Sequence, residues 1–297
     1  MEVVSVGDFK RVELADWAVM RVAGVDAVKF LQGQLSNDVE PVSTERSILA
    51  GYHNPQGRSV ALLRMVKNTA GDVLAVMPRE LVPDVVQRLR KYVLRAKVVL
   101  TDESDNVRVV GITGADAVPD VANASWISVE GVGRRFIGVL TRDANDALKD
   151  VVEIERGVWT RLDIMEGVPQ VYKATSEAFV AQMLNLDVLG GIAFDKGCYT
   201  GQEVIARAHF RGRVKRRMQR FRTSAPATAF ARGDTGQLQD GRSFKVVEAL
   251  QLEDGRCEFL AVAPTTPGAA GGEEAEASDG RPSVAAEQLA LPYSLPD

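Results

Sequence analysis

The feature that most constrains the fold is the order of β-rich and helix-like segments in the first hundred residues. β-Branched and aromatic residues gather in four short runs, and apolar residues recur at helical spacing in two other stretches. The four runs are 17–22, 47–53, 58–67 and 73–77, and the helix-like stretches are 26–35 and 81–93. The sequence Asn54-Pro55-Gln56-Gly57 between the second and third runs is typical of a hairpin turn. This order predicts a β-α-β-β-β-α-β unit, which is an α+β subdomain over residues 1–103.

The rest of the chain predicts a second α+β subdomain at 104–213 and a third region of different character. The second subdomain is expected to hold strands at 107–113, 126–129 and 135–140 and helices near 115–122, 144–151 and 155–165. From residue 214 the runs become short and alternating, with a hairpin signal at Glu253-Asp254-Gly255-Arg256. Residues 214–297 therefore predict a small β-barrel or sandwich. Within it, residues 264–282 lack aromatic residues and predict a mobile acidic loop, after which the apolar residues at 289–295 are expected to dock back.

Composition excludes several classes of protein. The longest apolar runs are about five residues, whereas a membrane span needs roughly 20. The N-terminus has neither the basic start nor the apolar stretch of a secretory signal. Two cysteines and two histidines support neither a disulfide framework nor a zinc site. We therefore expect a cytoplasmic, monomeric protein without a membrane or metal partner.

The formal net charge of −4 hides an uneven distribution of charge. Six acids and one base lie between residues 267 and 297, whereas eight bases and no acid lie within the sixteen residues 207–222. These bases are Arg207, Arg211, Arg213, Lys215, Arg216, Arg217, Arg220 and Arg222. Two interpretations remain open: a patch that contacts tRNA phosphates and releases them at high salt, or a solvated face with no partner.

The most informative segment lies near residue 200. It reads Lys196-Gly197-Cys198-Tyr199-Thr200-Gly201-Gln202-Glu203-Val204-Ile205-Ala206-Arg207. Thr200 and Glu203 have the spacing of a capping box, which predicts a helix starting at Gly201. Cys198 would then lie just before a helix N-terminus and two residues from Lys196, and both positive charges favour the thiolate over the thiol.

The cysteines and tryptophans each have a second interpretation. A lone cysteine is most often a small buried apolar residue, and Cys257, which alternates with apolar residues in an expected strand, is assigned to the core. Trp17 and Trp159 are either core residues or flat faces for a planar heteroaromatic ligand. His53 and His209 stand apart from any nucleophilic arrangement and are expected in surface or core roles.

From Lys196 to Arg207 the sequence resembles the signature of the YgfZ family, which are folate-binding, tRNA-modifying relatives of the glycine-cleavage T-protein, an aminomethyltransferase. Other stretches resemble motifs of this family in the same order along most of the chain. They are Asp16-Trp17-Ala18, Gly24-Val25-Asp26-Ala27, Gln32-Gly33-Gln34-Leu35-Ser36-Asn37-Asp38-Val39, Leu94-Arg95-Ala96-Lys97-Val98, Gly167-Val168-Pro169, Asn185-Leu186-Asp187, Gly190-Gly191-Ile192-Ala193-Phe194 and Leu291-Pro292-Tyr293-Ser294-Leu295.

The resemblance implies two α+β subdomains and a terminal β-barrel around a central opening that binds a folate, either tetrahydrofolate or a derivative. The two folate-contacting tryptophans of the family match Trp17 and Trp159. The resemblance also implies an accessory protein that supports iron–sulphur enzymes, including those that thiolate tRNA, through transient contacts with these enzymes or their assembly factors. The family has no established reaction, so no residue is assigned a catalytic role.

Two departures bear on activity. Ala61 and Leu62 occupy the places of an acidic pair thought to act at the folate in the T-protein, and neither side chain replaces a carboxylate electrostatically. A family Glu becomes Met165, with Glu166 one position later. Two hypotheses follow: a folate-binding accessory factor without independent catalysis, which the missing acids favour, or a folate-dependent aminomethyltransferase or demethylase.

Overall fold

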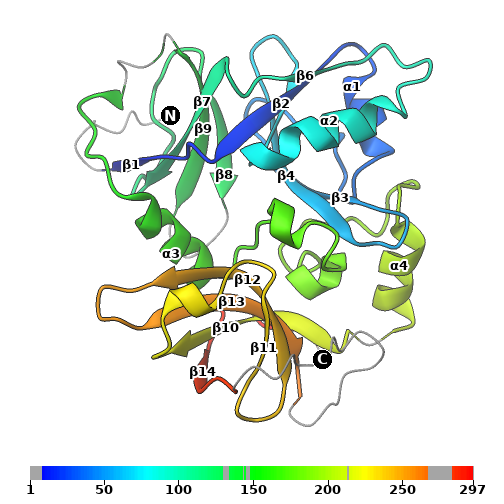
Figure 1. Cartoon of the computed structure of the whole chain (residues 1–297). Coiled ribbons are helices and arrows are strands. Elements are labelled where there is room, and N and C mark those ends of the chain that lie inside the picture. The colour runs from blue at the N-terminus through cyan, green and yellow to red at the C-terminus, as the bar shows by residue number, and fades with distance from the viewer. Residues whose placement is uncertain are drawn as a thin grey trace. The chain divides into compact units, whose positions relative to one another are not determined.

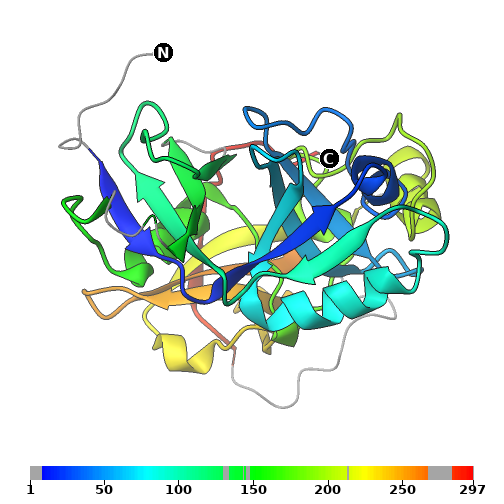
Figure 2. The same ribbon diagram turned by 90° about the horizontal axis from the view of Figure 1, so that it is seen from above.

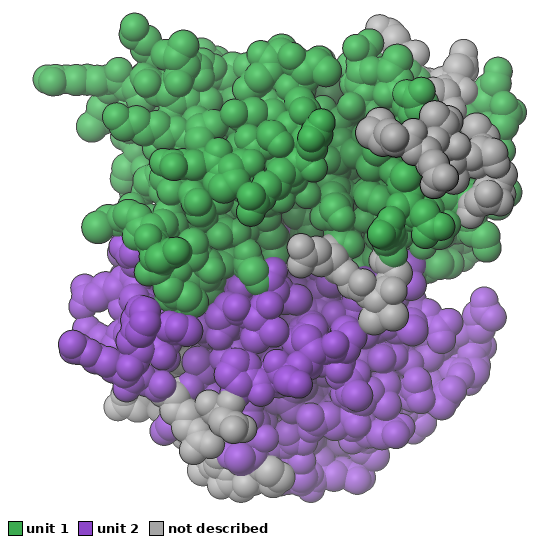
Figure 3. Space-filling view, turned by 180° about the vertical axis from the view of Figure 1, so that it is seen from behind, with its two compact units in different colours: residues 1–53, 60–159, 190–200 green, residues 54–59, 160–189, 201–297 purple. Residues whose placement is uncertain are grey.

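The computed structural model describes residues 9–129, 134–142, 144, 148–212, 214–266 and 283–296 (Figure 1). The chain forms two compact units (Figure 3). Unit 1 comprises Met1–His53, Val60–Trp159 and Gly190–Thr200, and unit 2 comprises Asn54–Ser59, Thr160–Leu189 and Gly201–Asp297. The hairpin turn at 54–59 thus belongs to unit 2, although both of its strands extend into unit 1.

Unit 1 contains a five-stranded antiparallel sheet with one face covered by helix α2. In pairing order its strands are β3 (Ile48–His53), β4 (Ser59–Lys67), β5 (Val73–Pro78), β2 (Trp17–Ala23) and β6 (Val99–Asp102). The helical elements are α1 (Ala27–Gln32), η1 (Arg79–Leu81) and α2 (Val82–Arg90). The predicted stripe of α2 is buried through Val82, Val85, Val86 and Leu89, with a proline tolerated in the first turn.

A second, four-stranded sheet completes unit 1. In pairing order its strands are β1 (Lys10–Glu13), β7 (Val107–Thr113), β9 (Arg135–Thr141) and β8 (Ser125–Val129). Strand β1 lies in the region expected to form the first subdomain, yet its register runs along β7 from Lys10 opposite Thr113 to Glu13 opposite Val110. Helix α3 (Arg156–Glu166) follows this sheet, as the pattern at 155–165 predicts.

The facing sides of the two sheets share one apolar core. Val19, Val66 and Val76 come from the first sheet, and Val109 and Ile137 come from the second. Alternation of apolar side chains along strands produces this arrangement, because every second residue points to the same face. The cores of both α+β regions are therefore continuous within unit 1.

Unit 2 is built on a third antiparallel sheet. In pairing order its strands are β11 (Thr235–Gln237), β12 (Ser243–Gln251), β13 (Cys257–Pro264), β10 (Arg216–Thr223) and β14 (Ala286–Leu289). The remaining elements are η3 (Lys173–Thr175), η4 (Ala181–Leu184), α4 (Gln202–Phe210) and η5 (Ala227–Ala229). Phe259 stacks on Phe221 at 5.3 Å and on Phe230 at 4.8 Å between ring centroids, which forms the aromatic centre of its core.

The predicted barrel is not confirmed, because the described strands form a five-stranded sheet with β11 and β14 as its two edges. The chain at these two edges is linked by the isolated bridge between Leu238 and Val284. There the Val284 amide donates to the Gln237 carbonyl at 2.8 Å, and the Gln239 amide donates to the Val284 carbonyl at 3.2 Å. The predicted hairpin at 253–256 is confirmed, with the Leu252 amide donating to the Arg256 carbonyl at 2.7 Å.

The end of the chain docks back as expected. β14 pairs with β10, and the Tyr293 hydroxyl donates to the Gly167 carbonyl at 2.7 Å. The mobile loop was predicted to start at residue 264, but Pro264 is still the last residue of β13. Residues 267–282 lie outside the described residues.

The helix expected near 115–122 does not form. Gly114 has φ +81° and Asn123 has φ +59°, so the segment begins and ends with left-handed turns, and Pro119 interrupts it. Part of the helix expected near 144–151 lies outside the described residues. The mixed α+β class is confirmed, while the boundaries at 103/104 and 213/214 and the central opening stay predictions.

Candidate functional site

Trp17 and Trp159 belong to the same apolar core of unit 1. Trp17 is the first residue of β2 and Trp159 lies in α3, and the two side chains are 3% and 1% exposed. Their indole Nε1 atoms are buried and have no acceptor among the described residues. An indole N–H that is buried without an acceptor is costly, and tryptophans in a core usually place it on one.

The ring faces of both tryptophans lie against their own chain. The guanidinium carbon of Arg64 is 5.6 Å from the Trp17 ring centroid, and that of Arg135 is 4.8 Å from the Trp159 centroid. Gly111 leaves room for Trp159, because a Cβ there would come within 2.5 Å of the ring. A ligand that binds here would therefore contact the indole edges and the guanidinium groups of Arg64 and Arg135, and not an open ring face of either tryptophan.

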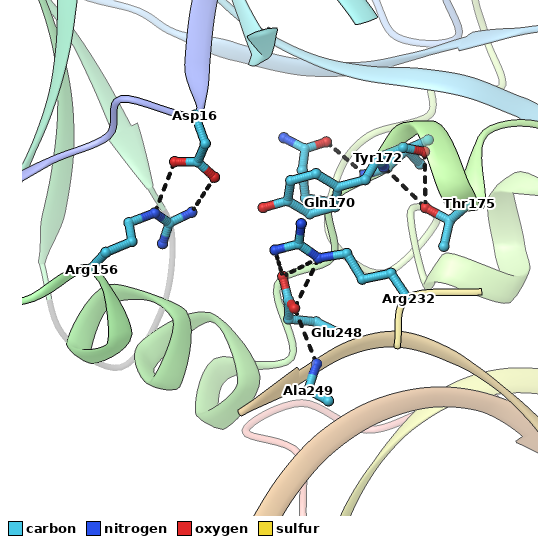
Figure 4. Close-up of polar contacts among 9 residues, drawn as sticks. Asp16, Arg156, Gln170, Tyr172, Thr175, Arg232, Glu248 and Ala249 are labelled. Carbon is cyan, nitrogen blue, oxygen red and sulfur yellow. Dashed lines mark hydrogen bonds and ion pairs between the residues drawn. The ribbon is translucent and has the colours of Figure 1, made fainter. Parts of the chain in front are cut away.

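An ion pair joins the two elements that carry the tryptophans. Asp16 directly precedes Trp17, and Arg156 opens α3 three residues before Trp159. The Arg156 Nε donates to Asp16 Oδ1 at 3.0 Å and a terminal nitrogen donates to Oδ2 at 3.2 Å (Figure 4). This two-point contact sets the position of α3 relative to the start of β2.

The Lys196 ammonium is committed to the backbone. It donates to the carbonyl oxygens of Gln32, Leu35 and Asn37 at 2.8, 2.8 and 2.6 Å, and it lies 5.4 Å from the Tyr199 ring centroid. Burial lowers the pKa of Lys196 to about 8, against the opposing effect of neighbouring carboxylates. All three N–H donors of the ammonium are used, so Lys196 holds the 32–37 loop rather than presenting a charge to solvent.

Ser36 and Asn37 strengthen the same junction. The Ser36 hydroxyl donates to the Gly191 carbonyl at 2.7 Å, and the Asn37 amide donates to the Gly190 carbonyl at 2.7 Å. The loop at 32–37 and the segment at 190–196 thus form one hydrogen-bonded piece of unit 1. The sequence analysis quoted Ser36 and Asn37 within the 32–39 motif but gave them no structural role.

Cys198 is exposed, unlike Cys257. A Cβ at neighbouring Gly197 would meet no atom within 4 Å, so the backbone on this side of the thiol is open. Burial raises the pKa of Cys257 to about 11, which keeps that thiol neutral and unreactive. The core assignment of Cys257 is confirmed, and the buried interpretation of Cys198 is wrong. Tyr199, next to Cys198, is buried, and burial raises its pKa to about 12.

The predicted capping box does not form. Helix α4 starts at Gln202 with Gly201 as its N-cap, and this cap makes no side-chain hydrogen bond. Gly201 has φ +83°, and a Cβ there would come within 2.5 Å of the Asn54 carbonyl oxygen, so close packing of the 54–57 turn requires glycine. Thr200 therefore lies one residue too early to cap, and Glu203 pairs with Arg207 instead.

Most of the basic run at 207–222 is used inside unit 2. Arg217 is buried against Asp187 at 2.8 Å, and Arg220 and Arg222 share the carboxylate of buried Glu258. Burial raises the pKa of Glu258, but the hydrogen bonds from the two arginines outweigh this and lower it overall. Arg207, Arg211 and Lys215 are exposed, and Arg213 lies outside the described residues.

Unit 2 has a polar cluster that sequence reasoning missed. The Arg232 guanidinium carbon is 3.4 Å from the Tyr172 ring centroid and the group donates to Glu248 at 2.8–3.1 Å (Figure 4). Gln170 is buried, and its Nε2 has no acceptor among the described residues. These residues are far apart in the sequence and had no shared motif that would have grouped them.

The remaining polar groups set limits on the chemistry. Among the described residues, no group of three His, Cys, Asp or Glu side chains is placed to hold a metal ion. His53 is fully buried, and burial lowers its pKa to about 3, so it is a neutral core residue. In the same part of the chain, none of the helices has the length and apolar character needed to cross a membrane.

The fold is that of the aminomethyltransferases of the glycine-cleavage system. The chain is similar to the crystal structure of glycine cleavage system aminomethyltransferase T from Bartonella henselae, with a TM-score of 0.66. The likeness covers 87% of this chain and 79% of that chain at 12% sequence identity, and at this identity it shows the fold alone.

A relative of known name narrows this class. Comparison with protein-family profiles gives no match. The tRNA-modifying protein YgfZ from Klebsiella pneumoniae (strain 342) is 33% identical over 270 residues, which cover 82% of this chain and 81% of that protein. The chain belongs to the YgfZ family.

Proposed function

We propose that this protein is a cytoplasmic, folate-binding accessory protein that supports iron–sulphur enzymes and, through them, the thiolation of tRNA. Its relative of 33% identity is a tRNA-modifying protein, and its fold is that of an aminomethyltransferase. The two together favour a protein that keeps a folate-binding fold and takes part in tRNA modification.

The observation that carries the folate proposal is the pair of buried indole N–H groups without acceptors, at Trp17 and Trp159. Both lie in one core of unit 1, and each ring carries a guanidinium on it, from Arg64 and Arg135. A reduced folate has ring nitrogens, a ring carbonyl and carboxylates, which are acceptors for such donors and cations. We infer that tetrahydrofolate or a derivative binds beside these indole edges.

The accessory role is favoured over catalysis by the environment of Ala61 and Leu62. Both side chains are fully buried in β4, between apolar neighbours. A catalytic carboxylate at either position would need a partner for its charge, and these positions carry neither the acid nor an exposed surface. The alternative, a folate-dependent aminomethyltransferase or demethylase, would require turnover of a methylamine donor with free tetrahydrofolate, and we expect none.

Tetrahydrofolate titration followed by calorimetry tests the proposal. Trp17→Phe and Trp159→Phe keep an aromatic ring in the core but remove the N–H donor. Each should weaken binding by roughly 1–3 kcal/mol. Trp126→Phe is the matched control, because Trp126 is the third tryptophan and packs in the other core of unit 1. Equal affinity of all three variants and the parent chain would refute the folate site.

We further propose that the exposed thiol of Cys198 is the group through which the motif acts. Lys196 holds the segment that carries Cys198 to the 32–37 loop, so the thiol is presented from a fixed backbone. A single thiol cannot hold an iron–sulphur cluster alone, so a contact with a cluster requires ligands from a partner protein.

Complementation separates the two cysteines. Cys198→Ser should fold and bind folate as the parent does, but fail to restore thiolated tRNA in a strain that lacks the protein. Cys257→Ser should restore it. Full activity of Cys198→Ser together with loss of activity in Lys196→Met would show that the motif acts without its thiol.

A direct contact with tRNA would use Arg207, Arg211 and Lys215, the described bases of the run that remain exposed. Replacing all three by glutamine should reduce the slope of log affinity against log salt by about 3 if each neutralises one phosphate. Arg216→Gln is the control, because its guanidinium donates to Ser243 and the Val262 carbonyl.

A further inference from the structure

Four exposed large apolar side chains, including the two most exposed among the described residues, come from adjoining segments of unit 1. Leu94 is 87% exposed, Val25 85%, Val99 61% and Tyr92 49%. We call these four residues the Leu94 patch. Single exposed apolar residues are normal, but a group of them on one surface marks an interaction site.

The backbone brings the members of the Leu94 patch together. Val25 lies in the turn between β2 and α1. Tyr92 and Leu94 lie in the segment between α2 and β6, which passes beside α1 (Figures 1 and 2), and Val99 is the first residue of β6. Asp26 Oδ2 accepts from the Lys97 amide at 2.7 Å, and Ala23 pairs with Val99 in the β2–β6 ladder. Gly24 touches this segment so closely that a Cβ would come within 2.1 Å of the Lys97 carbonyl oxygen.

The turns of this segment point its apolar residues outward. The Tyr92 amide donates to the Leu89 carbonyl and the Leu94 amide donates to the Tyr92 carbonyl, so the chain ends α2 and reverses within a few residues. Leu94 and Tyr92 are therefore held in an ordered backbone while their side chains remain in solvent. A fixed exposed apolar group binds a partner at a lower entropic cost than a disordered one.

Bases surround the Leu94 patch, and no carboxylate pairs with them. Lys29, Lys91, Arg95 and Lys97 are exposed, and none forms an ion pair with a described residue. Three half-buried arginines elsewhere in unit 1 do find acids: Arg21 pairs with Asp72 and Glu103, Arg108 with Glu13 and Arg156 with Asp16. The acids that would complement the four bases are therefore to be supplied from outside the described chain.

We propose that the Leu94 patch is the docking surface for a partner protein whose own surface presents apolar side chains rimmed by aspartate and glutamate. Three of its four side chains are aliphatic and provide no stacking face, and the single ring of Tyr92 offers no run of faces for successive bases, which disfavours single-stranded RNA. The segment is a turn and not an amphipathic helix, which disfavours a lipid surface. A symmetric contact between two copies would bring like charges together, which disfavours self-association.

Photo-crosslinking in cells that make the full-length chain tests this proposal. The photoreactive residue p-benzoylphenylalanine replaces Tyr92 and, as a control in a second chain, Val152, which is also well exposed in unit 1. We expect a discrete protein adduct from position 92 that position 152 does not produce, and a crosslinked partner peptide that contains Asp or Glu beside apolar residues. The crosslink is measured whether or not tRNA thiolation or folate binding is affected. A negative result would therefore contradict the docking proposal without bearing on the proposed function.

Substitutions beside the crosslinker decide whether the adduct depends on the patch. Leu94→Ser and Arg95→Glu should each reduce the yield of the position-92 adduct at least fivefold, while the matched Val152→Ser and Arg142→Glu should leave it unchanged. A yield that does not respond to Leu94→Ser or Arg95→Glu overturns the proposal. So does an adduct that ribonuclease removes, an adduct with lipid or with a second copy of this chain, or the absence of any protein adduct.

Discussion

Strand β10 and the segment between α2 and β6 are both rich in bases, and the two regions use them differently. In β10, Arg217 is 3% exposed and pairs with Asp187, while Arg220 and Arg222 share Glu258. In the α2–β6 segment, the side chains of Arg95 and Lys97 are exposed and form no ion pair with a described residue. The comparison teaches that the density of bases in a sequence does not measure the positive charge that a folded surface presents.

Strand register explains the first case. Arg222 lies directly opposite Glu258 in the β10–β13 ladder, and Arg220 lies two residues along on the same face. One carboxylate therefore neutralises two guanidinium groups that are far from it in sequence. The α2–β6 segment belongs to a turn, and no neighbouring strand aligns acids with its bases.

Removing the carboxylate from the buried pair should produce the largest effect. Asp187→Asn keeps the shape of the side chain but leaves the Arg217 guanidinium buried without its counter-charge, which costs about 3–5 kcal/mol of unfolding free energy. Urea denaturation measures this loss. The control is Glu203→Gln, which breaks the exposed Glu203–Arg207 pair of the same basic run and should cost less than about 0.5 kcal/mol. Equal costs would remove the distinction between the two kinds of pair.

Burial alone can keep a base neutral, and His53 shows this. Its pKa is lowered from 6.5 to about 3 by burial, so between these pH values the unfolded chain binds the proton and the folded chain does not. Stability therefore falls as the pH drops below 6.5, by about 2 kcal/mol at pH 5. Denaturation at pH 7 and pH 5 measures the change, with His53→Gln as the variant in which this contribution disappears. A parent chain equally stable at both values would contradict the neutral assignment.

Exposed side chains without partners should contribute least to the unfolding free energy. Leu94→Ser, Arg95→Ser and Lys97→Ser should each change the unfolding free energy by no more than about 0.5 kcal/mol, since none of these side chains is buried or paired. Thermal and urea denaturation check this. A loss above about 1 kcal/mol for Leu94→Ser would show that the Leu94 patch packs within the chain.

Much of the fold was predictable from the sequence because its signals are local. The strands at 17–22, 47–53, 58–67, 73–77, 107–113, 126–129 and 135–140 all form, since alternating apolar residues near turns specify strands wherever the sheet lies. The last strand of the predicted β-α-β-β-β-α-β unit forms as β6, whereas the short edge strand β1 was missed, because four residues carry too little periodicity. The predicted helix near 115–122 failed for the opposite reason: its apolar spacing was present, but Gly114, Pro119 and Asn123 impose turns.

For the candidate site, the sequence indicated which residues to consider but not their burial or their contacts. The motif from Lys196 to Arg207 and the two tryptophans stand out in the sequence through rarity and resemblance. Their environments do not, because burial and pairing depend on residues that lie far away in the chain: Lys196 on the carbonyls of the 32–37 loop, Trp159 on Gly111 and Arg135. The Thr200–Glu203 spacing is that of a capping box, but the box does not form, because the 54–57 turn packs closely against Gly201 and Gly201 is the N-cap.

The mixed α+β class, most strands, the buried face of α2 and the family signature follow from the sequence alone, because each depends on the order and period of neighbouring residues. The order of strands in the third sheet, the exposure of Cys198 against the burial of Cys257, and the set of bases that remain at the surface depend on the tertiary structure. The physical reason is that solvent exposure and electrostatic pairing act over distances of a few ångströms in space, whatever the separation of the groups along the chain.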